Sequence, residues 1–213
     1  MSNSANSEPK SDNIKVTKGK IDRTTRAALQ GGPFRGCTIW LTGLSGSGKT
    51  TIAYATEEYL VKRNINAYVL DGDNTRSCLN EDLGWSPEDC EENSRRLSKV
   101  AKLFADAGLV CLVSVISPCR AYRDKARRLH TEAELPFCET FIGTPVAECE
   151  RRDVKGLYKK FRAGTIEGMP GLDEDYEEPV NPELTIPTVG QTVDESVDQI
   201  IKYLESLNIV EKS

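Results

Sequence analysis

The sequence has a single histidine, His130, and its seven cysteines include no pair spaced as C-x-x-C. Structural zinc sites use four cysteine or histidine ligands at short spacings, so this composition argues against one. An odd number of cysteines also argues against a disulfide framework, which is typical of small secreted proteins. We therefore expect free thiols and a reducing compartment, with Cys111 and Cys138 behaving as small apolar residues within strands.

Long apolar runs are missing as well. No stretch approaches the roughly 20 apolar residues that span a bilayer, and the N-terminus lacks the apolar core of a secretory signal. The net charge is −5, which argues against nucleic-acid binding through bulk electrostatics. We expect a protein that binds neither membranes nor nucleic acid and that lies in the cytoplasm, with the nucleus as the alternative.

The 213 residues are enough for one α/β domain with a full core, but not for a second domain of ordinary size. A Ser-, Asn- and Lys-rich start predicts a disordered or loosely attached segment over 1–30, followed by one folded domain over 31–213. Periodicity predicts strands at 37–42, 67–70, 109–114, 137–142 and 184–186, and helices at 49–63, 93–107, 120–131 and 193–207. This alternation predicts a mainly parallel sheet with helices on both faces.

One segment, over about 153–182, is rich in glycine, proline and basic residues, among them Lys155. Glycine gives the backbone freedom to move, and lysine can pair with phosphate. Such a stretch inside a compact enzyme predicts a mobile lid that closes over a bound anion.

Residues 43–50, GLSGSGKT, match the phosphate-binding pattern G-x-x-x-x-G-K-[ST] at every fixed position. Glycines allow a tight turn whose N–H groups point inward, and the helix that follows offers its N-terminus to phosphate. Lys49 would reach the β- and γ-phosphates of ATP, and the Thr50 hydroxyl would bind Mg²⁺. The candidate ATP-binding residues here are Gly43, Ser45, Gly46, Ser47, Gly48, Lys49, Thr50 and Thr51.

Acidic residues follow the second predicted strand, at Asp71 and Asp73, whereas the third predicted strand ends in Ser114. The two carboxylates could orient Mg²⁺ and take the proton from an acceptor hydroxyl. Asp and Gly are also common in solvated turns, so the residues alone leave both interpretations open. Further on, Ser86 and Pro87 are typical of a helix start, and Trp85 could anchor that loop or stack on a base.

Several motifs together resemble the adenylyl-sulfate kinase family, in particular the kinase half of animal bifunctional phosphoadenosine-phosphosulfate synthases. Besides the phosphate loop, they are DGDN (71–74), LGWSPED (83–89), EN (92–93), FADAG (104–108), ISP (116–118) and DVKGLY (153–158). The match runs from about Gly36 to Val210. It implies a P-loop kinase fold and transfer of the ATP γ-phosphoryl group to the 3′-hydroxyl of adenosine 5′-phosphosulfate (APS), giving ADP and 3′-phosphoadenosine 5′-phosphosulfate.

The resemblance also implies roles for individual residues. Lys49, Asp71, Asp73 and Lys155 would be catalytic, and Thr50 and Asp71 would hold Mg²⁺. Arg152 would lie near the ATP adenine. The residues implied to bind the acceptor are Asp73, Arg76, Trp85, Asn93, Ile116, Ser117, Lys155 and Met169. A homodimer and a fused or partner ATP sulfurylase are implied as well.

The chain departs from the family pattern on the acceptor side. Cys90 stands where the family usually has Arg, Met169 where it has Phe, and Cys119 where it has an aromatic residue. Arg can hold an anionic group through two parallel hydrogen bonds, whereas Cys cannot. Two alternatives therefore accompany the expected activity. One is a related kinase that acts on another small nucleotide or sugar, and the other is a nucleotide-binding regulatory domain without turnover.

Overall fold

The computed structural model describes residues 14, 17 and 19–211, and within them it contains one five-stranded sheet. All strand pairs are parallel and the strand order is β2-β3-β1-β4-β5. The strands are β1 (Cys37–Thr42), β2 (Ala67–Asp71), β3 (Val110–Ser114), β4 (Phe137–Ile142) and β5 (Leu184–Ile186). The predicted strands are thus confirmed, within one residue at each end.

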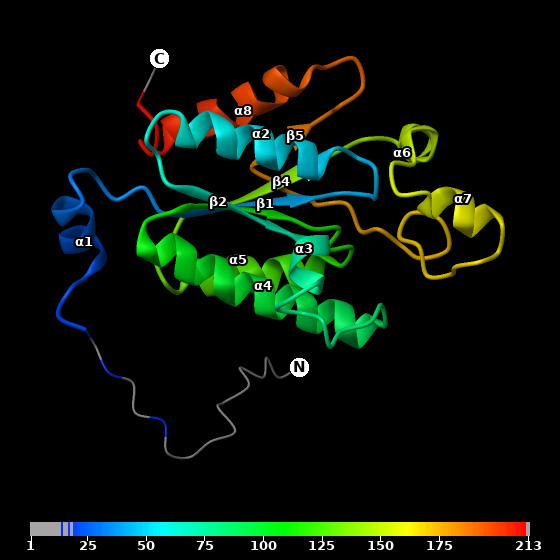
Figure 1. Cartoon of the computed structure of the whole chain (residues 1–213), viewed down its shortest axis with the longest axis horizontal. Helices are drawn as coiled ribbons and strands as arrows, with labels where there is room; N and C mark the ends of the chain where they lie inside the picture. Colours follow the sequence, from blue (N-terminus) through cyan, green and yellow to red (C-terminus); the bar gives the residue numbers. More distant parts are fainter. Residues whose placement is uncertain (1–13, 15–16, 18, 212–213) are drawn as a thin grey trace.

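Helices cover both faces of this sheet. They are α1 (Arg23–Leu29), α2 (Lys49–Val61), α3 (Gly72–Arg76), α4 (Pro87–Ala107), α5 (Arg120–Thr131), α6 (Val146–Arg152), α7 (Leu157–Arg162) and α8 (Val193–Ser206). Figure 1 shows α2 and α8 on one face, α4 and α5 on the other, and α6 and α7 beyond one end of the sheet. The predicted fold class, a mainly parallel sheet with helices on both faces, is confirmed.

The two faces of the sheet carry separate cores. On β1, Ile39 and Leu41 pack into the cluster that includes Ile52 of α2 and Ile200 of α8. Between them, Trp40 points the other way, into the cluster that includes residues of α4 and α5. All six residues of β1 are buried, and its apolar side chains alternate between the two cores.

Helices α3 and α4 differ from the sequence-based expectation. The turn predicted after the second strand is the short helix α3, and Asp71 caps its N-terminus. The helix expected from residue 93 begins at Pro87, where the Ser86 hydroxyl accepts a hydrogen bond from the Asp89 N–H at 3.2 Å. The helix start that Ser86 and Pro87 indicated is therefore confirmed, and the helix includes the acidic residues between 88 and 92.

Of the predicted N-terminal segment, 1–30, the structure describes residues 14, 17 and 19–30, and the rest lies outside the described residues. The described part was expected to be disordered or loosely attached, but it contains α1, where Arg23 and Arg26 both bond to Asp106 at the end of α4, at 2.6 Å and 3.0 Å. No helix among the residues that the structure describes has the length and apolar character needed to cross a membrane.

At the opposite edge of the sheet from β5, strand β2 has neighbouring strand β3 on one side only. The N–H of Val69, the middle residue of β2, donates to the Glu57 carboxylate of α2 at 2.9 Å. A side chain from the covering helix thus satisfies a main-chain donor of this edge strand.

Candidate active site

The phosphate-binding loop joins β1 to α2, as the sequence pattern predicts. Gly43, Gly46 and Gly48 have φ angles of 148°, 76° and 109°, which glycine adopts without strain. A Cβ atom added to Gly43 would lie 2.7 Å from the main-chain oxygen of Ile142, at the end of the neighbouring strand β4. The loop therefore needs glycine at this position for the turn and for close approach to β4.

Lys49 lies inside the loop and is only 7% exposed. Its Nζ donates to the main-chain oxygen of Leu44 at 2.7 Å and to the Ser47 hydroxyl at 3.4 Å. Burial lowers the pKa of Lys49 to about 8, and Lys155 acts in the same direction. A bound phosphate would replace these weak neutral partners with opposite charge and so favour the protonated lysine.

The outer side of the loop is fixed by side chains that follow the later strands. Thr144, after β4, and Thr188, after β5, both donate to the main-chain oxygen of Ser47, at 2.8 Å and 3.2 Å. Arg152 donates to the same oxygen at 3.2 Å, and the Tyr158 hydroxyl donates to that of Ser45 at 2.9 Å. The sequence analysis did not identify the two threonines. Their position just after predicted strands is the feature of the sequence that could have indicated a place near the site.

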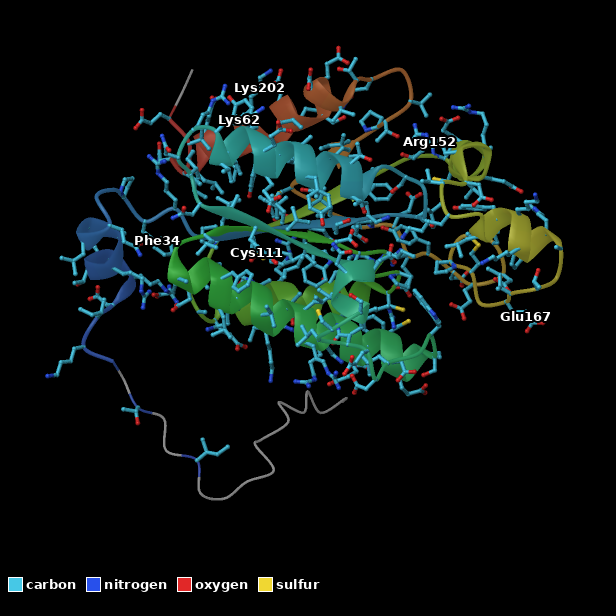
Figure 2. All side chains as sticks on the ribbon, viewed as in Figure 1. Phe34, Lys62, Cys111, Arg152, Glu167 and Lys202 are labelled. Atoms are coloured by element: carbon cyan, nitrogen blue, oxygen red, sulfur yellow. The ribbon has the colours of Figure 1, made fainter. Side chains whose placement is uncertain are left out.

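Figure 2 shows Arg152 at the same end of the molecule as Glu167, which belongs to the predicted lid. Phe34 lies at the opposite end. Arg152 also donates to the Thr188 hydroxyl at 2.9 Å and pairs with Glu148 at 2.8 Å. Its guanidinium therefore lies against the phosphate-binding loop, at the side where β5 ends.

The strand ends bring a hydroxyl and a carboxylate to the start of α2. The Thr50 hydroxyl donates to Oδ2 of Asp71 at 2.9 Å and lies 3.1 Å from the Ser114 hydroxyl. Asp71 and Ser114 are opposite each other in the register of β2 and β3. The other oxygen of Asp71 accepts from the N–H groups of Asp73 and Asn74 at 3.0 Å and 3.2 Å, which fixes the carboxylate in place.

This oxygen set fits Mg²⁺, a hard cation that proteins hold through one or two carboxylates together with substrate phosphates. Asp71 and Thr50 are the residues here that could hold it. Among the described residues no cluster of three or more His, Cys, Asp or Glu side chains could hold a metal ion by itself.

Asp73 points toward the predicted lid. Its carboxylate forms an ion pair with Lys155, which comes just before α7. Asp153 caps α7 by accepting from the N–H groups of Tyr158 and Lys159 at 3.0 Å and 2.9 Å. The structure thus brings together Lys49, Thr50, Asp71, Asp73 and Lys155, which sequence reasoning selected from separate motifs.

The predicted lid has an apolar cluster of its own. Buried Met169 packs with Leu44 of the phosphate-binding loop, Cys149 and Tyr158. A Cβ atom added to Gly171 would lie 2.7 Å from the Leu44 side chain. Met169, which sequence reasoning placed among the acceptor-binding residues, therefore lies in the packing between the lid and the phosphate-binding loop.

On the acceptor side, Arg76 and Trp85 lie together. The Arg76 guanidinium is 4.0 Å from the centre of the Trp85 ring and donates to the main-chain oxygens of Leu83 and Gly84, at 3.1 Å and 2.7 Å. Trp85 is 69% exposed, so its ring is accessible to a planar ligand.

The remaining acceptor candidates lie deeper. Asn93 is buried, and its Oδ1 accepts from the Asn80 amide at 2.9 Å. The buried Ser117 has a φ angle of 40°, and its hydroxyl accepts from the Trp40 indole N–H at 3.0 Å. Ile116, half-buried, precedes it, and its main-chain oxygen accepts from the Thr42 hydroxyl at 2.7 Å. The end of β1 and the segment after β3 are thus tied together.

Curated proteins are similar in sequence over most of this chain. The chain is 52% identical over 177 residues to the adenylyl-sulfate kinase of Saccharomyces cerevisiae, which covers 83% of this chain and 88% of the yeast protein. It is 51% identical over 174 residues to the bifunctional enzyme CysN/CysC of Mycobacterium tuberculosis, which covers 82% of this chain and 28% of that protein.

A solved structure is similar over most of the chain. The APS kinase CysC of Mycobacterium tuberculosis, in complex with AMPPNP and APS, has a TM-score of 0.79 and 50% sequence identity, over 81% of this chain and 99% of that one. Residues 35–187 match the family model described as adenylylsulphate kinase. The resemblance drawn from the sequence motifs is therefore confirmed, and the chain belongs to the adenylyl-sulfate kinase family.

Proposed function

We propose that the chain transfers the γ-phosphoryl group of ATP to the 3′-hydroxyl of APS, giving ADP and 3′-phosphoadenosine 5′-phosphosulfate. One observation carries the proposal: the hydrogen bond between Thr50 and Asp71 joins an intact phosphate-binding loop to the acidic turn at α3. Phosphoryl transfer needs the donor phosphate and the acceptor hydroxyl to meet at such a junction. The acceptor identity is supported by family membership and by the APS in the similar mycobacterial structure.

In the proposed reaction each side chain positions a reactant or stabilises charge. The loop N–H groups and Lys49 would hold the β- and γ-phosphates, and Lys155 would approach the transferring group from the lid. Asp73, as an ionised carboxylate, would accept the proton of the attacking 3′-hydroxyl. Mg²⁺, held by Thr50 and Asp71, would neutralise phosphate charge when bound. Arg76, Trp85, Asn93, Ile116 and Ser117 would bind the acceptor.

Coupled measurement of ADP release tests this assignment. The protein is supplied with ATP and Mg²⁺. Separate reactions also contain APS, adenosine 5′-monophosphate or a hexose as the acceptor. We expect ADP release that depends on APS. Release that depends on another acceptor would favour the related-kinase alternative, and no release with any acceptor would favour a regulatory domain.

Further expectations concern the assembly, the location and the nearest relatives of the protein. A homodimer is supported only by the family resemblance. A fused or partner ATP sulfurylase stays an expectation from the family resemblance. Fusion to a second enzyme is supported by the longer relative described as bifunctional, CysN/CysC, of which this chain matches 28%. The cytoplasmic location, the nuclear alternative and the narrower resemblance to animal synthases stay predictions from the sequence.

Replacing Cys90 with arginine is expected to lower KM for APS by roughly tenfold, with little change in kcat, because a hydrogen bond to a charged group contributes about 1.5–3 kcal/mol to binding. The nearby Arg95 and Arg96 do not replace the missing charge freely, since Arg95 pairs with Glu92 at 2.5 Å and Arg96 with Asp82 at 2.6 Å. Steady-state kinetics with varied APS measures the effect.

The matched control is Cys78→Arg, which adds the same charge at an exposed cysteine beyond α3. It should leave KM for APS within twofold. If Cys90→Arg is folded and binds APS no better than the unmodified protein, the missing arginine does not explain acceptor affinity. A gain with another acceptor instead would favour the related-kinase alternative.

The lid over 153–182 should close when both nucleotides bind. Lys159 and Lys160 are exposed on α7, and bound phosphate and sulfate would pair with charges that otherwise repel one another. We expect hydrogen exchange over 164–175 to slow by about tenfold with ADP and APS present. The helix α8 serves as the internal reference, and equal exchange of 164–175 in both states would contradict closure.

A further inference from the structure

Arg123 of α5 is a fully buried cation, with 1% of its side chain exposed. It pairs with Glu139 of β4 at 2.6 Å. A single buried acid is enough to neutralise it, yet the guanidinium has further donors that need partners. The partners of those donors therefore show which parts of the chain Arg123 joins.

The remaining donors reach two main-chain segments that are distant in sequence. Nη1 donates to the main-chain oxygens of Ser117 and Pro118, at 2.6 Å and 3.1 Å. Nη2 donates to the main-chain oxygen of Glu177 at 2.5 Å. The first segment, 116–118, follows β3 and contains two candidate acceptor-binding residues; we call it the acceptor loop. The second, 176–178, is where the predicted lid returns to the core; we call it the lid root.

Other contacts join the same two segments. The Glu177 N–H donates to the main-chain oxygen of Pro118 at 3.0 Å, and the Arg120 N–H donates to the Glu177 carboxylate at 2.7 Å. The Tyr176 hydroxyl lies 2.8 Å from that of Thr42, and its ring stacks on Phe141 with centres 6.0 Å apart. The lid root is thus fixed to the core, and Arg123 lies at the centre of the junction.

The acceptor loop needs this support. The φ angle of 40° at Ser117 lies in the left-handed region, which is unfavourable for a residue with a Cβ atom. Such a conformation persists when surrounding contacts determine it. The Ser117 hydroxyl is held by Trp40 and Thr42, and its main-chain oxygen is held by Arg123.

We propose that Arg123 is a positioning residue that couples the acceptor loop to the lid root, so that the acceptor site is formed only when the lid root is seated. The proposal rests on the proposed function, because it takes the acceptor loop as part of the acceptor site. Its chemistry requires arginine: a planar guanidinium can bond Glu139 and three carbonyl oxygens at once, whereas a lysine ammonium has three donors and no fork.

The test compares Arg123→Lys with Arg127→Lys. Arg127 is the matched control because it lies on the same helix and also contacts Glu139, at 3.4 Å, but pairs mainly with Glu183 and reaches neither segment. We expect Arg123→Lys to raise KM for APS tenfold or more and to leave KM for ATP within twofold. Arg127→Lys should leave both within twofold.

Hydrogen exchange in the absence of nucleotides gives a readout that does not depend on the reaction. In Arg123→Lys, exchange at the amide of Glu177 should become about tenfold faster or more, while α8 is unchanged. If the unmodified protein shows no APS-dependent ADP release, the proposed function fails, and this exchange measurement still decides whether Arg123 joins the two segments.

A buried Glu139 left without a good partner could unfold the single variant. The double variant Arg123→Met with Glu139→Gln removes both charges, and the unmodified protein is its reference. The double variant should show the same rise in KM for APS, with KM for ATP within twofold of the reference. A folded variant with unchanged KM for APS, an equal rise in KM for ATP, or unchanged exchange at Glu177 would overturn the proposal.

Discussion

Replacing Lys49 with alanine is expected to lower kcat by on the order of 10³-fold or more while leaving the protein folded. Lys49 is buried inside the phosphate-binding loop, and within the described part of the chain its hydrogen bonds go to the neutral groups of Leu44 and Ser47. Its charge is therefore poised for the phosphoryl group, where negative charge develops during transfer. ADP release under saturating ATP and APS measures the loss, and circular dichroism checks the fold.

The control for this variant is Lys62→Ala. Lys62 follows the same helix, α2, but its side chain is exposed and pairs with Glu58 one turn earlier. Exposed pairs of this kind contribute little to stability, so activity should stay within twofold. A Lys49→Ala protein with the activity of the Lys62→Ala control would mean that ATP binds elsewhere.

Replacing either Asp71 or Asp73 with asparagine should lower kcat by on the order of 10²-fold or more. Asparagine still caps a helix, so Asp71→Asn should keep α3 while it removes the charge beside Thr50. Asp73→Asn removes the proposed proton acceptor and the ion pair with Lys155. Single-turnover kinetics separates loss in the chemical step from loss of nucleotide binding.

Asp106→Asn is the matched control for these two variants, because Asp106 pairs with Arg23 of α1 at the other end of the sheet. It should turn over normally. If both Asp71→Asn and Asp73→Asn also turn over normally, Asp71 and Asp73 have a structural role only, which agrees with the solvated turn that the sequence left open as the alternative.

The framework of the fold was predictable because the relevant signals are local. A continuous apolar run such as that from Cys37 to Thr42 predicts a strand buried on both faces. A strand with one solvated face would instead alternate apolar and polar residues. Gly108, with a φ angle of 101°, ends α4 where the helix predicted over 93–107 stops. The helix α3 was missed because five residues carry too little periodicity to separate a helix from a turn.

The site was predictable where one short motif holds the chemistry, as in the phosphate-binding loop. It was not predictable where side chains from separate strand ends converge. Thr144 and Thr188 both bond to the main-chain oxygen of Ser47, and only the order of strands β1, β4 and β5 brings them together. The place of Met169 was not predictable for a related reason. It was expected to bind the acceptor but is buried in the apolar cluster of the lid, and the spacing of residues in the sequence does not show such burial.

The contact between Glu57 and Val69 bears on how copies of this protein behave at high concentration. An edge strand with free main-chain donors is a template on which a strand of another molecule can add, and such addition leads to aggregates. The Glu57 carboxylate occupies the donor at the middle of β2 and places a negative charge there. An approaching strand would have to displace that charge, so this edge of the sheet discourages intermolecular strand pairing.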